Sequence, residues 1–363
     1  MGKRIIFTVF NDTSYDQRMI RICSSLTKAG YEVLLVGRRP RNAPPLVRQP
    51  FLQKRLRTPF TGGPLLYACF NIQLFFWLIF QRADAICAID LDTILPCYWA
   101  GSLRKWQRVY DAHELFCEMK EIVTRPAVYK IWKRIERYCV PAFRQGYTVN
   151  QLIADEFTRM YGVQYTVIRS IAVLESFSPP PSKTPYIIYQ GAVNEGRSFE
   201  TLIPAMQWVE VPLLICGDGN FMPAAKALAA QYGLAGKVIF KGMVLPQQLK
   251  ELTRGASIGI TLFDDTGISN FYSLANRFFD YIHAGIPQLC MDYPAYREIN
   301  NLYQIAVLTD DLSPENIAGQ LNILLNNRNL YNTLAANCVY ARQALNWQEE
   351  EKKLIAFYKK ILS

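Results

Sequence analysis

The chain is predicted to fold as an α/β protein with two doubly wound, Rossmann-like domains. Its 363 residues, half of them hydrophobic, suffice for two domains with cores of their own. Runs of β-branched residues alternate with segments of helical periodicity, which indicates parallel sheets covered by helices. The alternation stops at a proline-rich stretch, 174–185, and then starts again. We interpret this stretch as an interdomain linker, because a loop within one domain would not be followed by a complete new strand–helix series.

The first half of the sequence begins with a strand–helix–strand unit. Residues 3–10 form a predicted buried strand, and the helix after it ends at Gly30, where a second strand, 31–37, begins. Apolar side chains recur at helical spacing along this helix: Met19, Ile22, Cys23 and Leu26. Further strands are predicted at 84–89, 108–112 and 146–150.

The second half repeats the pattern. Strands are predicted at 186–191, 211–219, 237–242, 257–263, 286–291 and 305–309. We therefore expect a first domain over residues 1–176, a second over 177–345 and a C-terminal helix over 346–363. The apolar side of that helix carries Trp347, Leu354, Phe357, Tyr358 and Ile361.

The net charge of +10 belongs to the first half of the chain. Residues 1–180 contain 25 basic and 14 acidic side chains, whereas residues 181–363 contain 15 and 16. This imbalance indicates that the first domain meets an anionic partner: nucleic acid, a phosphate-bearing substrate or a membrane surface. A disordered chain is excluded, because 13% of the residues are aromatic.

The nine cysteines are scattered singly, without a CxxC pair, and the chain has only two histidines. This usage favours reduced thiols in a cytoplasmic protein and predicts no metal site. The N-terminal MGKRIIFTVF lacks the pattern of a secretory signal.

A basic segment followed by an apolar one allows two interpretations. Seven basic residues and no acidic residue lie between positions 38 and 57, and only Asn71 and Gln73 are polar in LLYACFNIQLFFWLIF (65–80). A helix of this length spans about 24 Å, too short for a hydrocarbon core of about 30 Å. The run is either a helix packed on the sheet or part of an in-plane contact with anionic lipid, and different residues can do each. Nucleic acid is not expected, since no common nucleic-acid-binding motif is present.

The segment 266–289, TGISNFYSLANRFFDYIHAGIPQL, carries the densest set of candidate binding residues. It follows a predicted strand, and ligands of open α/β sheets bind beyond the carboxyl ends of strands. Ser273 and Asn276 are polar groups at the start of a predicted helix, with Asn276 as its expected cap. Arg277 in the first turn opposes the helix dipole unless an anion such as a diphosphate lies between them. Asp280, one turn further on, can accept hydrogen bonds from a ribose diol.

Within this segment, YSLANRFFDYIHAGIPQ (272–288) resembles the donor-site helix of GT-B glycosyltransferases, especially family 4. That family commonly has two glutamates separated by seven residues. Here Tyr272 occupies the first position and Asp280 the second, and Ala275 replaces the usual proline. The resemblance implies ribose binding by Asp280 and two domains that face a cleft, with the C-terminal helix crossing back to the first domain.

Other segments are similar to the same family. In YQGAVNEGRSFETLIPAM (189–206), the resemblance implies that Gly191 lets the backbone approach the donor and that Arg197 reaches its diphosphate. CGDGN (216–220), with Gly217 and Gly219, resembles the glycine turn near the nucleotide base. TVIRSIAV (166–173), NDTSYDQRMIR (11–21), DLDTILP (90–96) and YDAHELF (110–116) extend the resemblance over nearly the whole chain.

Polar residues of the first domain are candidates for the acceptor side. His113 and Glu114 follow the predicted strand 108–112 and so lie at its carboxyl end. We take His113 as a candidate catalytic residue, the alternative being a loop histidine with satisfied contacts, and expect His283 to have a packing or solvation role. Asp16 and Arg18 can position the acceptor or meet its phosphate, although Asp16 can equally cap the helix after it.

The resemblance implies a retaining, metal-independent glycosyltransferase that uses a nucleotide-diphosphate sugar of the UDP or GDP type. Arg197, Arg277 and the helix N-terminus would stabilise charge on the leaving diphosphate. The expected acceptor is a glycan or lipid-linked intermediate of cell-surface polysaccharide synthesis, at the inner face of a membrane. Two alternatives stay open: a sugar-nucleotide epimerase on the same fold, and a non-catalytic membrane-binding protein.

Overall fold

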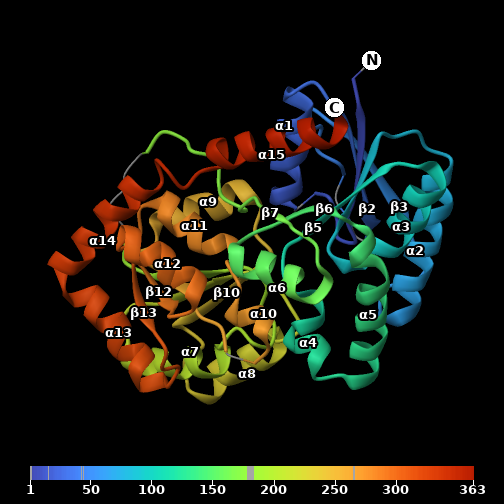
Figure 1. Ribbon diagram of the computed structural model, residues 1–363. Coiled ribbons are helices and arrows are strands. Elements are labelled where there is room, and N and C mark those ends of the chain that lie inside the picture. The colour runs from blue at the N-terminus through green and yellow to red at the C-terminus, as the bar shows by residue number, and fades with distance from the viewer. Residues whose placement is uncertain (1, 15, 42, 44, 178–183, 265) are drawn as a thin grey trace. The chain divides into compact units, whose positions relative to one another are not determined.

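The computed structural model describes residues 2–14, 16–41, 43, 45–177, 184–264 and 266–363, and it divides into two compact units. The first unit contains Met1–Glu118, Ile122–Ser170 and Glu350–Ser363, and the second contains Met119–Glu121 and Ile171–Glu349. Each unit is a parallel sheet with helices on both faces (Figure 1), as the sequence predicts. Residues 178–183 of the expected linker lie outside the described residues.

Among the described residues of the first unit, seven strands form one parallel sheet in the order β3-β2-β1-β4-β5-β6-β7. The strands are β1 (Arg4–Thr8), β2 (Glu32–Arg39), β3 (Leu52–Arg57), β4 (Ala85–Ile89), β5 (Gln107–Ala112), β6 (Gln145–Thr148) and β7 (Thr166–Val167). The longer helices are α1 (Gln17–Lys28), α2 (Gly63–Ile79), α3 (Ile94–Arg104), α5 (Pro126–Cys139) and α6 (Gln151–Tyr161). Short 3₁₀ turns are η1 (Leu91–Thr93), η2 (Phe116–Glu118) and η3 (Val140–Ala142).

The second unit contains a parallel sheet of six described strands in the order β10-β9-β8-β11-β12-β13. They are β8 (Ile187–Gln190), β9 (Leu213–Cys216), β10 (Val238–Gly242), β11 (Ile258–Thr261), β12 (Gln288–Met291) and β13 (Ala306–Thr309). Its helices are α7 (Phe199–Ala205), η4 (Met206–Trp208), α8 (Met222–Gln231), α9 (Pro246–Gly255), α10 (Ile268–Phe271), α11 (Asn276–Ala284), α12 (Pro294–Tyr303), α13 (Pro314–Asn326) and α14 (Arg328–Ala341). Two helices, α4 (Lys120–Val123) and α15 (Trp347–Leu362), contain residues of both units.

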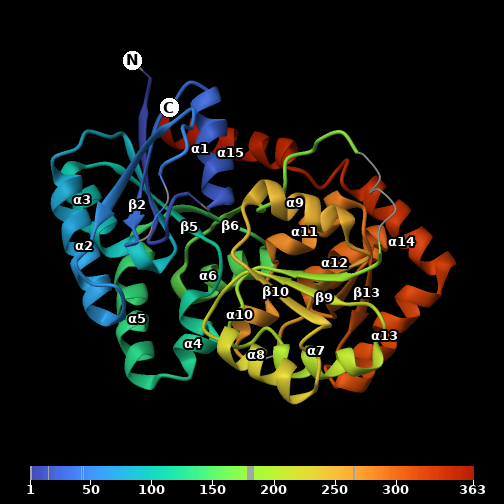
Figure 2. The ribbon, with the colours of Figure 1, turned by 180° about the vertical axis from the view of Figure 1, so that it is seen from behind.

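The strand order creates a topological switch point in each sheet. Numbered within its own unit, the first sheet has the order 3-2-1-4-5-6-7 and the second the order 3-2-1-4-5-6, so in each the chain leaves the first strand in one direction and later returns to the other side of it. Because strand crossovers are right-handed, the helices before and after this reversal cover opposite faces. In the first unit, α2, α3 and α5 lie side by side in both views (Figures 1 and 2). Ligands of such sheets bind at the switch point, beyond the carboxyl ends of the strands. That point lies between β1 and β4 in the first unit and between β8 and β11 in the second.

The C-terminal residues complete the core of the first unit. Leu354, Phe357 and Tyr358 of α15 are buried, as the helical periodicity predicts. The Tyr358 ring centroid lies 5.9 Å from that of Phe7 in β1 and 6.3 Å from that of Tyr147 in β6. These aromatic contacts fix the end of the chain on the sheet.

Sequence reasoning overlooked β3 and β7. The sequence of β3, LQKRLR, resembles a basic loop, because it has no apolar run. β3 is an edge strand, and charged side chains on such strands discourage pairing with other chains. β7 has only two residues, too few for a periodicity to appear.

Candidate active site

The second unit places Arg277 at its switch point. Arg277 is the second residue of α11, and its guanidinium lies 4.6 Å from the ring centroid of Tyr189 in β8 and 4.5 Å from that of Phe263, just after β11. Its Nη1 atom donates to the Tyr189 hydroxyl at 3.2 Å and to the Gln190 carbonyl at 3.4 Å. The two strands that flank the switch point thus hold this cation between them.

The Arg277 side chain is incompletely satisfied. It is 7% exposed, and among the described residues neither Nε nor Nη2 has a hydrogen-bond partner. An unsatisfied buried N–H costs about 1–3 kcal/mol, and more when it belongs to a charged group. The sequence nevertheless places the cation at a helix N-terminus, where the dipole repels it. A bound anion would remove both penalties, and the role of Arg277 as an anion ligand stays a prediction.

Arg197 lies on the same aromatic ring as Arg277. Its guanidinium is 4.7 Å from the Phe263 centroid, and its Nη1 donates to Oδ1 of Asn270 at 3.1 Å. Two guanidinium groups stacked on one phenylalanine repel each other unless negative charge is shared between them. The arrangement is therefore suited to a ligand that carries more than one anionic group, such as a diphosphate.

Two glycines keep backbone close to this cation. Gly191 follows β8 with φ +128°, and a Cβ there would lie 3.0 Å from Nη1 of Arg277. Gly217 follows β9 with φ +148°, and a Cβ there would lie 1.8 Å from the Gly191 carbonyl oxygen. A side chain at Gly217 would therefore separate the two turns. Gly219, in the same turn, donates its N–H to Oδ1 of Asp218 at 2.8 Å.

The start of α11 differs from the expectation. Ala275 is the N-cap residue and Asn276 is the first helical residue, so the prediction that Asn276 caps the helix is wrong. A residue of another helix, Tyr296, fixes the start of α11. Its hydroxyl accepts from the Ala275 N–H at 3.0 Å and lies 3.2 Å from Oγ of Ser273. Nothing in the sequence near Ala275 indicates this contact, since Tyr296 belongs to α12.

Asp280 and His283 lie further along α11. Oδ2 of Asp280 accepts from Nε2 of Gln190 at 2.7 Å, which ties this carboxylate to the end of β8. Nε2 of His283 lies 2.7 Å from the Leu345 carbonyl oxygen.

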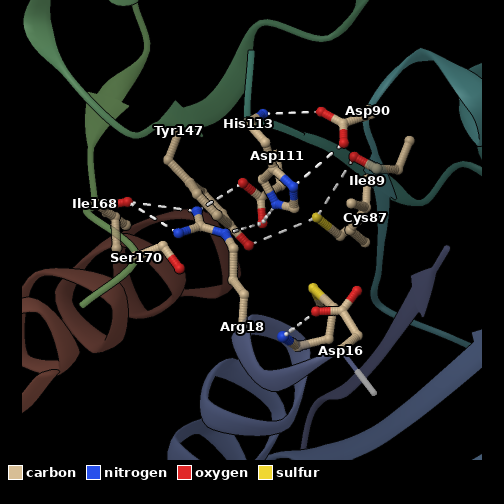
Figure 3. Close-up of polar contacts among 12 residues, drawn as sticks. Asp16, Arg18, Cys87, Ile89, Asp90, Asp111, His113, Tyr147, Ile168 and Ser170 are labelled. Atoms are coloured by element: carbon tan, nitrogen blue, oxygen red, sulfur yellow. Dashed lines mark hydrogen bonds and ion pairs between the residues drawn. The ribbon is translucent and has the colours of Figure 1, made fainter. Parts of the chain in front are cut away.

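The first unit gathers a second charged cluster at the ends of β4 and β5 (Figure 3). His113 lies between two carboxylates, with Nδ1 3.2 Å from Oδ2 of Asp90 and Nε2 3.2 Å from Oδ2 of Asp111. The His113 backbone N–H also donates to Oδ1 of Asp90 at 2.9 Å. Burial opposes the charge on the imidazole, but Asp90 and Asp111 outweigh it and raise the pKa of His113 to about 10. With this pKa, His113 is an imidazolium at neutral pH.

Arg18 anchors the cluster from α1. It forms a bidentate ion pair with the fully buried Asp111, in which Nη2 lies 2.8 Å from Oδ1 and Nε lies 3.3 Å from Oδ2. Its Nη1 donates to the Ile168 carbonyl at 3.3 Å. Burial favours the neutral carboxyl of Asp111, yet Arg18 and then His113 hold its pKa below the usual value. All three guanidinium nitrogens of Arg18 thus have protein partners, so this arginine supports the site and does not reach outward.

Asp16 and Glu114 occupy the edges of this cluster. Oδ1 of Asp16 accepts from the Met19 N–H at 3.0 Å, so the helix-capping interpretation of Asp16 is confirmed. Burial raises the pKa of its carboxyl. Glu114 lies near Asp92, and burial, Asp90 and Glu114 together raise the pKa of Asp92 well above its usual value.

Sequence reasoning missed the partners that define both clusters. Asp111 stands in the predicted strand RVYDA, and a carboxylate inside a buried strand is a signal for a paired charge. Tyr189 and Phe263 gave no such signal, because an aromatic residue at a strand end is ordinarily a core residue. In the described part of the chain, no group of three His, Cys, Asp or Glu residues is arranged to hold a metal ion.

Comparison with known proteins assigns the second unit. Residues 173–339 match the family described as glycosyl transferases group 1. The chain is a glycosyltransferase of the GT-B fold. No curated protein matches the sequence of this glycosyltransferase.

Solved structures resemble this glycosyltransferase along its whole length. Sucrose-phosphate synthase from Thermosynechococcus elongatus has a TM-score of 0.79 and 17% identity, covering 99% of each chain. HepE from Anabaena, solved in complex with UDP-glucose, has a TM-score of 0.75 and 12% identity, covering 99% of this chain and 100% of its own. A glycosyltransferase from Rickettsia africae has a TM-score of 0.72 and 12% identity, covering 100% of this chain and 99% of its own. At these identities the likeness establishes the fold.

Proposed function

We propose that this glycosyltransferase moves a sugar, with retention of anomeric configuration and without a metal ion, from a UDP- or GDP-type donor to a glycan or lipid-linked acceptor. The single observation that carries the proposal is Arg277, a buried cation at a switch point whose Nε and Nη2 have no partner among the described residues. A diphosphate is the anion that suits this place, because the guanidinium of Arg197 lies 4.7 Å from the centroid of the same Phe263 ring. HepE, which shares the fold, binds UDP-glucose.

The donor would lie across the ends of β8 and β11. Arg277, Arg197 and the free N–H groups at the start of α11 would stabilise charge that develops on the leaving diphosphate, the main catalytic contribution in such a site. The nucleotide could approach the backbone closely at three positions without side chains, Gly191, Gly217 and Gly219. Asp280 would accept hydrogen bonds from the ribose. Ser273 and Asn276 would line the entry to α11.

The proposed chemistry needs no protein base. The departing phosphate oxygen takes the proton of the acceptor hydroxyl as the new glycosidic bond forms on the same face of the sugar. A charged His113 supports this route, because an imidazolium cannot accept that proton. We assign the first unit to the acceptor, with His113 and Glu114 nearest to it. Asp16 and Arg18 hold α1 and Asp111 in place.

The setting proposed for the enzyme is the cytoplasmic face of a membrane, in the synthesis of a cell-surface polysaccharide. The basic first half of the chain and the nine free cysteines support this setting. No helix in the described part of the chain is long and apolar enough to cross a membrane.

The proposal is tested by incubating the purified chain with UDP- and GDP-sugars in the presence of EDTA. We expect slow hydrolysis or transfer that releases a nucleoside diphosphate, with the α configuration of the donor kept in the product by NMR. Conversion of the sugar nucleotide to an epimer, without release of diphosphate, would establish the epimerase instead. Loss of activity in EDTA that is restored by a divalent ion would overturn metal independence.

A further inference from the structure

We propose that the outer faces of α2 and α3 form a docking surface for an anionic lipid bilayer. This names the surface behind the proposed membrane setting and does not depend on the sugar-transfer chemistry. α2 is apolar on two opposite sides. Its inner side buries Leu66, Phe70, Leu74 and Leu78 against the sheet. Its outer side exposes Leu65, Ile72 and Phe76, and Phe80, the residue just after the helix, continues their helical spacing.

This outer side is unusual for a surface helix. The side of a helix that faces water is ordinarily polar or charged, but Phe76 is 56% and Phe80 is 82% exposed. No charged residue stands between Arg57 and Arg82. A contiguous exposed apolar strip of this kind marks an interaction site.

The apolar strip continues onto α3, which lies beside α2 (Figures 1 and 2). The Trp99 ring centroid lies 6.1 Å from that of Phe75, and both Trp99 and Leu103 are exposed. The enlarged surface therefore combines aliphatic side chains with an exposed tryptophan, the residue types that enter the headgroup region of a bilayer.

Basic side chains border the strip at the C-terminal ends of both helices. Arg82, Arg104 and Lys105 are exposed there, and Arg104 links the two ends because its Nη2 donates to the Gln81 carbonyl at 3.1 Å. Residues 33–83 contain eight basic residues and no acidic residue. The acids that bound this segment are paired, Glu32 with Arg4 at 3.0 Å and Asp84 with Lys3 at 3.4 Å.

The charge selects the occupant of this surface. A second copy of the chain would place the same cations opposite one another, and like charges in contact are destabilising. With an anionic bilayer, each basic residue near the lipid surface contributes favourable binding free energy, and the apolar side chains insert between the headgroups. Because α2 has 17 residues, about 25 Å, it would lie in the plane of the interface.

The test is co-sedimentation of the full chain with vesicles of phosphatidylcholine alone or with one third phosphatidylglycerol. We expect binding to the anionic vesicles only, weakened by high salt. The double variant Phe76→Ser, Phe80→Ser should bind at least about tenfold more weakly, and Arg82→Glu with Lys105→Glu should bind several-fold more weakly. The matched control is Leu302→Ser with Tyr340→Ser, two residues of the second unit that are each 73% exposed, and it should bind like the wild type.

Three results would overturn this docking surface. They are absence of wild-type binding to anionic vesicles at low salt, equal losses in the control and test variants, and a concentration-dependent dimer that Phe76→Ser with Phe80→Ser abolishes. A ligand-free unfolding temperature equal to that of the wild type shows that each variant is folded. Because the readout is lipid binding, a chain that binds vesicles but transfers no sugar would contradict the proposed function and leave the docking surface standing.

Discussion

Arg18 and Arg277 occupy the same position in two helices and differ in their partners. Each is a buried arginine and the second residue of its helix, α1 or α11. All three guanidinium nitrogens of Arg18 donate hydrogen bonds, to Asp111 and to the Ile168 carbonyl. In Arg277, Nε and Nη2 have no partner among the described residues. A buried charge that is fully paired supports the fold, while a partly unpaired one at a switch point is suited to a ligand. Under the proposed function, this contrast distinguishes an arginine that supports the fold from one that binds the donor.

The largest expected effect comes from breaking the paired arginine. Arg18→Met should lower the free energy of unfolding of the first unit by about 3–5 kcal/mol, because it leaves the carboxylate of Asp111 buried with His113 alone. Denaturant unfolding followed by circular dichroism measures the loss. Arg134→Met, on the exposed side of α5, is the matched control and should change the stability by less than about 0.5 kcal/mol. A similar small loss for Arg18→Met would contradict the scaffold role.

The second effect concerns the turns that shape the unpaired site. Gly217→Ala should cost about 2–4 kcal/mol and weaken donor binding, since its Cβ would lie 1.8 Å from the Gly191 carbonyl oxygen. Gly233→Ala is a sharp control, because Gly233 also has a positive φ, +68°, but nothing lies within 4 Å of its Cβ. It should cost about 1 kcal/mol and leave nucleotide binding unchanged. Equal effects of the two changes would show that backbone strain alone explains the first.

The third effect is a pH dependence located at the paired cluster. The folded pKa of His113, about 10, exceeds its unfolded value near 6.5, so its contribution to stability is complete below pH 6.5 and is lost as the pH rises toward 10. We expect a loss of about 2 kcal/mol over this window after allowance for solvent screening. His113→Gln should be less stable at pH 6.5 and should lack that slope. A wild-type stability that is flat from pH 6.5 to 10 would refute the charged imidazole.

The smallest effect is expected at Arg197. The Arg197 side chain is half-buried, and the hydrogen bond that it donates to Asn270 only orients the guanidinium. Removing the side chain should therefore leave the stability of the ligand-free protein nearly unchanged. Arg197→Ala should weaken binding of UDP or GDP by about fivefold, the value of one charge-assisted contact in a partly wet site. Titration calorimetry measures it. Stronger binding in this variant would show that Arg197 lies outside the anion site.

The sequence predicted the fold closely and the site partially. Buried strands such as 31–37 and 84–89 were predictable because runs of β-branched and apolar residues have few alternatives, and Arg277 stood out because a cation opposes the dipole at a helix start. The Tyr296 hydroxyl at the entry of α11 and the stacking of two arginines on Phe263 were not predictable, because each joins residues of different elements. Periodicity and the charge at a helix end can be predicted from neighbouring residues in the sequence. The tertiary partners of a side chain cannot, because they belong to other elements.

The most direct test of the account compares the thermal unfolding of wild type and Arg277→Ala with and without saturating UDP and GDP. We predict that the wild type is stabilised by at least one of the two nucleotides. The variant should unfold at or above the ligand-free wild-type temperature and should lose most of that stabilisation, corresponding to about hundredfold weaker binding. Nucleotide stabilisation that is undiminished in the variant would contradict the central claim that the unpaired Arg277 is the anion ligand.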